Sequence, residues 1–351
     1  MLRTVREAWR SACARLSALQ SDAPEVEARE LLRAALGIDP RAFLLLDFAS
    51  SLDPAADERL ESLLARRAAR EPLQYLLGTV PFCELELEVG PGVLIPRPET
   101  EVLVERLSAR IEPKLDSWAG IHAPLLVDVG TGSGAILLAL LHRFPALHGL
   151  GLDRSREALR WARRNRERTL PRERSVGFVR ADLLGSVVGS GTHRSTWDRP
   201  ANGPDAGPSS APVGGVPASA SVAGVPASPP AGVPAPAPSG SALAIDVIVS
   251  NPPYIPSHEI ESLAPEVRDH EPRLALDGGP DGLVLVTRIV ADAARLLRPG
   301  GLLAFELALD QADRVVSLLE NYGFGLLERY RDLTGRERGV IAERRGSLSP
   351  W

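Results

Sequence analysis

Four consecutive residues of this chain are the best suited to chemistry: Asn251, Pro252, Pro253 and Tyr254, which follow the apolar run 245–250. The side-chain oxygen of Asn251 and the carbonyl of Pro252 can accept both N–H protons of an amide or amino nitrogen. Such a nitrogen is a poor nucleophile, and this grip would aim its lone pair at an electrophile. The prolines fix φ, and Tyr254 offers a flat face for a planar group. We predict a site for a planar nitrogen; the alternative is a rigid turn that only closes a strand.

A second candidate is the glycine-rich turn at residues 130–134, which follows the strand-like run 125–129. Glycines let the backbone pass close to a ligand, and the helix expected next would present unpaired N–H groups. Such turns occur in nucleotide-binding folds of several chemistries, and also without a ligand. The G-x-G-x-G spacing differs from the G-x-G-x-x-G of pyrophosphate binding, and acidic Asp128 precedes it. This context favours a methyl donor over a dinucleotide.

Acidic residues also end the next two strand-like runs. Asp153 follows residues 148–152 and could accept both hydroxyls of a ribose, although by itself it would more often cap a helix. Asp182 and Leu183 follow residues 176–179 and could contact an adenine amine and an adenine face. Ligands of open parallel sheets lie beyond the carboxyl ends of the strands, where all these groups fall.

The elements that must position these residues alternate between strand and helix. Such alternation predicts a largely parallel sheet covered on both faces. The expected strands are 125–129, 148–152, 176–179 and 244–250, with helices over 134–144 and 155–168.

Residues 1–74 carry apolar side chains every three or four positions, which predicts an all-helical domain. Asp22, Asp39 and Asp53 stand in turn-forming stretches, well placed to cap or turn. Residues 1–75 hold eleven Lys and Arg against twelve Asp and Glu, so we expect a protein-docking domain and no electrostatic nucleic-acid clamp.

A β-hairpin connector is expected over residues 75–95, because residues 84–89 alternate strictly between acidic and apolar. The remaining domain, 96–345, is interrupted by a Pro/Ala/Gly-rich insertion at about 187–243. Its part 200–242 has eleven prolines and no aromatic residue, leucine or isoleucine. Such a composition cannot bury enough apolar surface, so we expect a disordered loop that the fold tolerates.

The composition excludes several classes of function. Cys13 and Cys83 are the only cysteines, which argues against a metal site and a disulfide framework. No apolar run is long enough to span a bilayer, and the first sixteen residues lack the apolar stretch of a secretory signal. The net charge of −5 argues mildly against a partner bound through phosphates. We expect a cytoplasmic monomer with no membrane insertion, metal or directly bound nucleic acid.

The stretch from Asp128 to Gly134 resembles the first motif of the class I S-adenosylmethionine methyltransferases. The resemblance implies a Rossmann-like α/β domain with a mostly parallel seven-stranded sheet, and S-adenosyl-L-methionine as cofactor. Leu183 departs from it, since some members carry an aromatic residue there. The implied cofactor-binding residues are Asp128, Gly130, Thr131, Gly132, Ser133, Gly134, Asp153, Asp182, Leu183 and Asn251.

The Asn-Pro-Pro-Tyr motif is shared by adenine-N6 methyltransferases and protein-glutamine methyltransferases. Four further stretches resemble the release factor glutamine methyltransferase family (HemK/PrmC), and the resemblance covers nearly all the chain outside about 187–243. It implies methylation of the N5 amide of the glutamine in the Gly-Gly-Gln motif of peptide-chain release factors. It makes Asn251, Pro252 and Tyr254 the catalytic candidates, with Pro253 also binding substrate. The four stretches are residues 70–78, 93–101, 271–283 and 332–338.

Three alternatives stay open. A related family methylates a glutamine of a ribosomal protein, although residues 99–101 favour the release-factor branch. An adenine methyltransferase should carry a basic and aromatic recognition region, which is missing here. A non-catalytic binding module should have lost the residues of the acceptor site. Arg97 and Thr100 are further possible site residues: Arg97 could position donor or substrate or be a surface charge, and the segment with Thr100 could simply start a helix.

Overall fold

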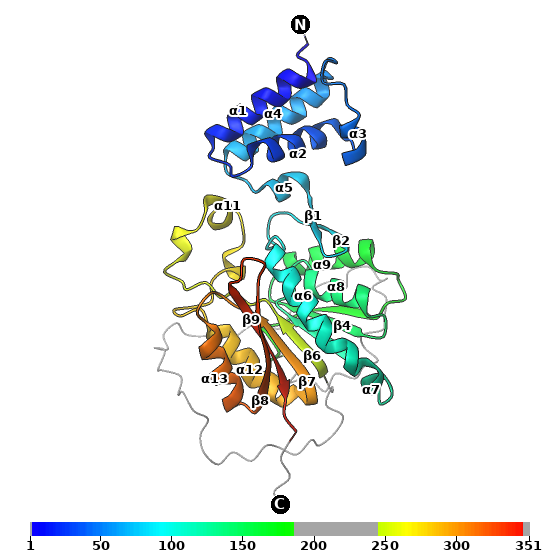
Figure 1. The fold of residues 1–351 in the computed structure, drawn as a ribbon, viewed down its shortest axis with the longest axis vertical. Helices are drawn as coiled ribbons and strands as arrows, with labels where there is room; N and C mark the ends of the chain where they lie inside the picture. The colour runs from blue at the N-terminus through cyan, green and yellow to red at the C-terminus, as the bar shows by residue number, and fades with distance from the viewer. Residues whose placement is uncertain (1, 186–244, 347–351) are drawn as a thin grey trace, which may run out of the picture.

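The computed structural model describes residues 2–185 and 245–346 (Figure 1). The predicted disordered insertion at about 187–243 lies outside the described residues. No helix in the described ranges has the length and apolarity needed to cross a membrane.

The N-terminal part is helical and has its own apolar core. The core joins side chains such as Leu16, Leu31, Leu32, Leu60 and Leu64, all at most 2% exposed. Figure 1 shows this helical bundle at one end of the molecule. Its helices are α1 (Val5–Ala18), α2 (Pro24–Leu36), α3 (Pro40–Leu44), α4 (Pro54–Ala68) and α5 (Leu73–Leu77).

Short polar residues begin most of these helices. Thr4 and Glu7 form a reciprocal capping box on α1, while Asp39 and Asp53 accept backbone N–H bonds at the starts of α3 and α4. Each such cap stabilises a helix by about 1 kcal/mol. Asp22, expected to cap or turn, lies in the bend before α2 and does not cap it, because the N-cap of α2 is Ala23 and makes no side-chain hydrogen bond.

The connector is shorter than the predicted hairpin over 75–95. Residues 73–77 form α5, and only β1 (Thr79–Phe82) and β2 (Leu85–Glu88) pair as antiparallel strands. The reason is local: Gly78 ends α5 in the left-handed conformation at φ 78°, which glycine adopts without strain. Leu76 packs into the helical core, so residues beside Gly78 are held in a helix.

The C-terminal part is built on a seven-stranded sheet in the order β5-β4-β3-β6-β7-β9-β8. The first five strands are parallel to one another, β9 runs antiparallel to both of its neighbours β7 and β8, and β8 therefore runs in the same direction as the first five. The sheet is thus mostly parallel, as predicted. The strands are β3 (Leu125–Val129), β4 (His148–Asp153), β5 (Val176–Arg180), β6 (Ile245–Ser250), β7 (Leu297–Glu306), β8 (Phe324–Arg331) and β9 (Glu337–Arg344).

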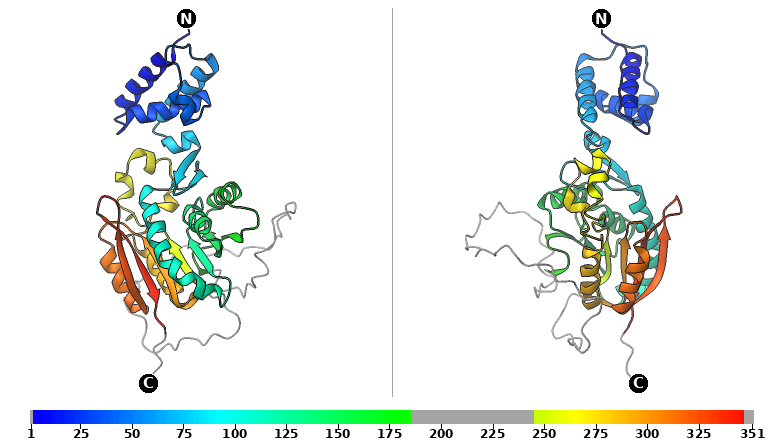
Figure 2. Two further views of the ribbon diagram at one scale, coloured as in Figure 1. Left: turned by 45° about the vertical axis from the view of Figure 1, so that its right-hand side comes forward. Right: turned by 90° about the vertical axis from the view of Figure 1, so that its left-hand side faces the viewer.

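Helices cover both faces of this sheet (Figure 2). One face packs on α6 (Pro98–Ile111), α8 (Ala135–Arg143) and α9 (Arg156–Thr169), and the other on α12 (Val284–Leu296) and α13 (Ala312–Asn321). Alternate residues of β3 therefore enter different cores, as with Leu126 and Val127. The remaining short helices are η1 (Glu112–Lys114), α7 (Leu115–Ala119), η3 (Ile260–Ser262), α11 (Pro265–Arg268) and η4 (Arg273–Ala275).

Candidate active site

The strand order places the site at the carboxyl edge of the sheet. The chain runs outward from β3 to β4 and β5 and re-enters beside β3 as β6, so a crevice opens where the order reverses. In register, Val129 lies beside Leu152, and Asp128 lies beside Val249. The residues that follow β3, β4 and β6 are thereby gathered at one edge.

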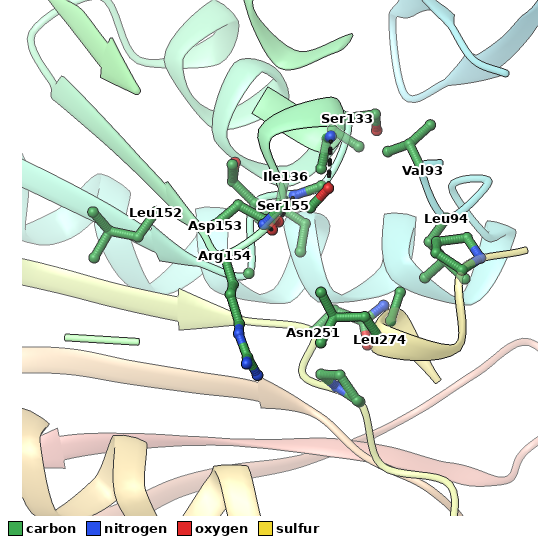
Figure 3. A pocket seen from close by; sticks show the side chains of 18 of the residues that line it. Val93, Leu94, Ser133, Ile136, Leu152, Asp153, Arg154, Ser155, Asn251 and Leu274 are labelled. Carbon is green, nitrogen blue, oxygen red and sulfur yellow. Dashed lines mark hydrogen bonds between the residues drawn. The ribbon is translucent and has the colours of Figure 1, made fainter. Parts of the chain in front are cut away.

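A cavity at this edge contains much of the predicted site (Figure 3). Side chains such as Asp153, Asn251 and Leu274 surround it, although they come from distant parts of the chain. The predicted residues that line it are Thr100, Gly130, Thr131, Gly132, Ser133, Asp153, Asp182, Leu183, Asn251 and Pro253. Those that do not are Arg97, Asp128, Gly134, Pro252 and Tyr254.

The glycine turn needs its glycines. Gly130, Gly132 and Gly134 have φ angles of 74°, 57° and 84°, a region that other residues rarely adopt. A Cβ atom at Gly130 would meet nothing within 4 Å, so this backbone borders open space. The turn therefore leaves room for a ligand against the main chain before α8.

Asp153 is held by the turn itself. Its carboxylate accepts hydrogen bonds from the Gly132 N–H at 2.9 Å and the Ser155 N–H at 2.7 Å. Burial raises the pKa of Asp153, while these N–H donors oppose the rise. Ser155, not Asp153, caps α9. The capping role is thus taken by Ser155, and each oxygen of Asp153 already accepts one backbone N–H.

Asp128 lies beneath the turn rather than in the cavity. Only 1% of it is exposed, and its Oδ2 accepts a hydrogen bond from the Thr131 hydroxyl at 2.7 Å. Burial raises the pKa of Asp128 to about 7, although the Thr131 hydrogen bond opposes the rise. Its contact with Thr131 makes it a support of the turn.

Asp182 and Leu183 border the cavity on the side of β5. The Asp182 carboxylate is 60% exposed and pairs with Arg288 at 2.9 Å. Leu183 has a φ of 54°, an unusual value for a leucine, and packs partly against the core of α12 and α13. The carboxylate is therefore less restrained than that of Asp153.

Asn251 belongs to a hydrogen-bonded chain that ends on a buried acid. Its Nδ2 lies 3.3 Å from the Thr100 Oγ1, and the Thr100 hydroxyl donates to Glu306 Oε2 at 2.7 Å. The Tyr254 hydroxyl donates to the other oxygen of Glu306 at 3.2 Å. Glu306 is 1% exposed, and burial raises its pKa. The motif is thus anchored from α6 and from the end of β7.

Tyr254 is held at both of its polar ends. Its carbonyl accepts a hydrogen bond from Gln311 Nε2 at 3.0 Å. Burial, together with the charge of Glu306, raises the pKa of Tyr254, so its hydroxyl remains a donor at neutral pH. Tyr254 does not line the cavity, and the stacking role of its ring stays a prediction.

Two segments close the outer side of the cavity. One holds Val93 and Leu94, and the other holds Pro272, Leu274 and Ala275. Arg97 and Glu271 join them: the Arg97 Nη2 lies 2.5 Å from Glu271 Oε1, and Glu271 Oε2 accepts the Ile95 N–H at 3.3 Å. Arg97 thus forms an ion pair that joins the two segments, and its role toward donor or substrate stays a prediction.

The segment that holds Pro272, Leu274 and Ala275 also contacts the helical bundle, through residues that precede them. Glu266 accepts hydrogen bonds from Arg67 and Arg70, each at 2.9 Å. Arg67 is only 5% exposed and also pairs with Glu27 of α2. His270 adds a contact to the carbonyl of Ala69 at 3.1 Å. One segment, residues 255–282, thus joins the motif, the cavity and the helical bundle.

Sequence reasoning missed several residues of the site. Glu306 could have been found, because it ends an apolar strand, and an acidic residue at a strand end is the signal that identified Asp153. Arg154 and Ser155 line the cavity because they follow Asp153 directly. Glu266 and Glu271 carry no local signal, since their partners are distant in the chain.

Comparison with known proteins gives consistent results. Residues 7–78 match the family model of the PrmC N-terminal domain. The release factor glutamine methyltransferase of Caulobacter vibrioides is 34% identical over 350 residues, which is 100% of both chains. That of Geobacter sulfurreducens is 36% identical over 90% of this chain and 88% of its own length.

A solved structure also matches. It is the protein-(glutamine-N5) methyltransferase (release factor-specific) of Alicyclobacillus acidocaldarius, with 22% identity and a TM-score of 0.35 over 74% of this chain and 99% of that one. The full-length sequence relatives carry the assignment. The chain is a methyltransferase, and it belongs to the release factor glutamine methyltransferase family.

Proposed function

We propose that this chain transfers a methyl group from S-adenosyl-L-methionine to the side-chain N5 amide of the glutamine in the Gly-Gly-Gln motif of peptide-chain release factors. The observation that carries the proposal is that Asn251 borders the same cavity as Asp153 and the glycine turn. A planar acceptor nitrogen and a nucleoside-type donor would meet there. The names of the full-length relatives support the choice of substrate.

The cavity fits this cofactor. The open space beside Gly130 accommodates a ligand against the backbone, and Asp153 offers a carboxylate for ribose hydroxyls. Asp182 and Leu183 stand where an adenine would follow. When bound, S-adenosylmethionine supplies a sulfonium methyl group that is already activated toward nucleophiles.

The protein contributes mainly position. Asn251 Oδ1 and the Pro252 carbonyl accept the two N–H protons of the target amide and turn its lone pair toward the methyl group. The bound donor would supply its methyl group to this nitrogen in exchange for its sulfur–carbon bond, and the extra amide proton would leave to water. Holding the two reactants in line accounts for much of the rate enhancement.

We also propose that the helical bundle (residues 1–74) docks the release factor. The enzyme is then a cytoplasmic monomer that meets its substrate during translation. The near balance of charge in the bundle suits a protein surface better than a phosphate backbone.

The experiment is to incubate the protein with methyl-labelled donor and, separately, a release factor, ribosomal protein and DNA. Label on the glutamine of the release factor is expected. Label on DNA alone would contradict the proposal, and label on ribosomal protein alone would move it to the related family. Asn251→Ala should abolish transfer and leave donor affinity within about threefold, because Asn251 acts on the acceptor.

A further inference from the structure

The hydrogen bonds around Thr100 fix the direction in which the Asn251 amide points. In its ionised form the buried Glu306 only accepts hydrogen bonds. The Thr100 hydroxyl gives its single proton to Glu306 Oε2, at 2.7 Å. Toward Asn251 the same oxygen can therefore only accept. Asn251 must present its NH₂ group to Thr100, and its Oδ1 is left for another partner.

This direction matters for the proposed reaction. The substrate amide that receives the methyl group offers N–H protons. Of the two polar atoms in the Asn251 side chain, only Oδ1 can accept a hydrogen bond from them. With the amide reversed, its NH₂ group would face the NH₂ group of the substrate, and both would lack acceptors. Asn251 alone does not prefer either direction, so the choice must come from its neighbours.

From these contacts we propose that Thr100 and Glu306 are positioning residues, which hold the Asn251 amide with Oδ1 toward the substrate nitrogen. The inference rests on the proposed function and deepens it. Glu306 aligns the Thr100 hydroxyl, and Thr100 aligns Asn251. Tyr254 donates to the second oxygen of Glu306 and thereby keeps the carboxylate from rotating.

The location of the two residues supports such a role. Thr100 lies in the first turn of α6, 4% exposed, and Glu306 ends β7, 1% exposed. Both residues thus belong to regular elements, and the two are 206 positions apart. A positioning group on rigid elements holds its geometry better than one on a loop.

A matched pair of variants at Thr100 tests the inference. Thr100→Val removes the hydroxyl and keeps the shape of the side chain, whereas Thr100→Ser keeps the hydroxyl. Thr100→Val should lower kcat on the release factor about tenfold or more, because misplacement of a positioning group slows the reaction. The KM for the release factor and the donor Kd should change less than about threefold. Thr100→Ser should restore most of kcat.

Glu306→Gln tests the same chain at its other end. It should lower kcat, and the Thr100→Val/Glu306→Gln double variant should be no slower than Thr100→Val alone, because both changes interrupt one chain. This variant also serves if Thr100→Val fails to fold.

A spectroscopic measurement is independent of turnover. The chain has four asparagines, so ¹⁵N-asparagine labelling gives four side-chain amide signals, of which Asn251→Asp identifies one. In the ligand-free protein, Thr100→Val should shift or broaden the Asn251 NH₂ signal, and Thr100→Ser should leave it near its wild-type position.

Each opposite result overturns the inference. For the Thr100 variants, such a result is a wild-type kcat in Thr100→Val or a loss of kcat in both variants. For the double variant, it is a kcat lowered by the product of the two single effects. For the spectrum, it is an Asn251 NH₂ signal that is the same in Thr100→Val as in the wild type. A wild-type protein that leaves the release factor unlabelled overturns the proposed function, and the inference with it. A wild-type protein that labels it while Thr100→Val is equally fast overturns only the inference.

Discussion

Arg97 and Glu271 are 174 positions apart in the chain, and their side chains meet with 2.5 Å between Nη2 and Oε1. The pair is unequal: the Arg97 side chain is 31% exposed and that of Glu271 only 1%. Loss of Arg97 therefore strands a buried carboxylate, whereas loss of the Glu271 charge leaves an arginine that water can reach.

We predict that Arg97→Met destabilises the fold by roughly 2 kcal/mol, less than the loss from a fully buried pair, and that Glu271→Gln costs clearly less. Burial raises the pKa of Glu271 and Arg97 opposes the rise, so in Arg97→Met the pKa moves further up. A raised acid pKa in the folded state means that stability falls as pH rises. Urea unfolding at pH 5 and pH 8 should show the deficit of Arg97→Met growing with pH, and a constant deficit would contradict this.

Asp153 and Asp182 offer a comparison between two acids at one cavity. Asp153→Asn should weaken donor binding by about 10- to 100-fold, because hydrogen bonds to a charged group are worth about 1.5–3 kcal/mol. Asp182→Asn should change it less than about threefold, since that carboxylate is exposed and already paired with Arg288. Calorimetric titration with the donor measures both. Equal losses would mean that the exposed acid contributes as much as the buried one.

The contact between Glu266 and the helical bundle predicts a substrate-specific effect. Glu266→Gln weakens the link to Arg67 and Arg70, so the bundle and the cavity should hold a release factor together less well. We expect the KM for full-length release factor to rise about three- to tenfold, with the KM for a short Gly-Gly-Gln peptide unchanged.

The control for this effect is Glu61→Gln. Glu61 also pairs with two arginines, Arg3 and Arg15, but all three lie within the bundle. The control should leave both KM values unchanged. A peptide KM that rises together with the protein KM would show that Glu266 acts on the cavity itself.

Asp128 predicts a pH dependence of the ligand-free protein. Its pKa is raised to about 7, so the folded state retains a proton that the unfolded chain releases near pH 4. The contribution of Asp128 to stability is therefore complete below pH 4 and is lost as pH rises through 7, by at most roughly 4 kcal/mol. Asp128→Asn lacks this dependence. Parallel stability curves for the two proteins between pH 5 and pH 8 would refute the assignment.

Local patterns predicted the fold because each element is specified by its own residues. The strand from Leu125 to Val129 is entirely buried, and its apolar residues, interrupted only by Asp128, predict a parallel strand covered on both faces. The glycine turn was equally visible, because positive φ angles require glycine there. Asp153 was found because it ends a strand.

The remainder of the site depends on contacts that no local pattern encodes. Tyr254 carries a ring that suggests stacking, yet its hydroxyl is bound to Glu306 from another strand. Arg97 carries a charge that suggests a ligand, yet it pairs with Glu271. Asp22 has a side chain suited to capping, but the N-cap of α2 is the next residue, Ala23. In each case the contacts of the folded chain, and not the type of the side chain, determine where the residue is held.

The segment of residues 255–282 connects the helical bundle to the cavity, so that binding at one can be coupled to binding at the other. Glu266 and Glu271 lie on it only five residues apart, one bonded to the helical bundle and the other to the wall of the cavity. If a partner on the bundle changes the affinity of the cavity for its ligand by some factor, thermodynamic reciprocity requires the ligand to change the affinity for the partner by the same factor. Donor titrations with and without release factor therefore measure one coupling free energy, whichever molecule is added first.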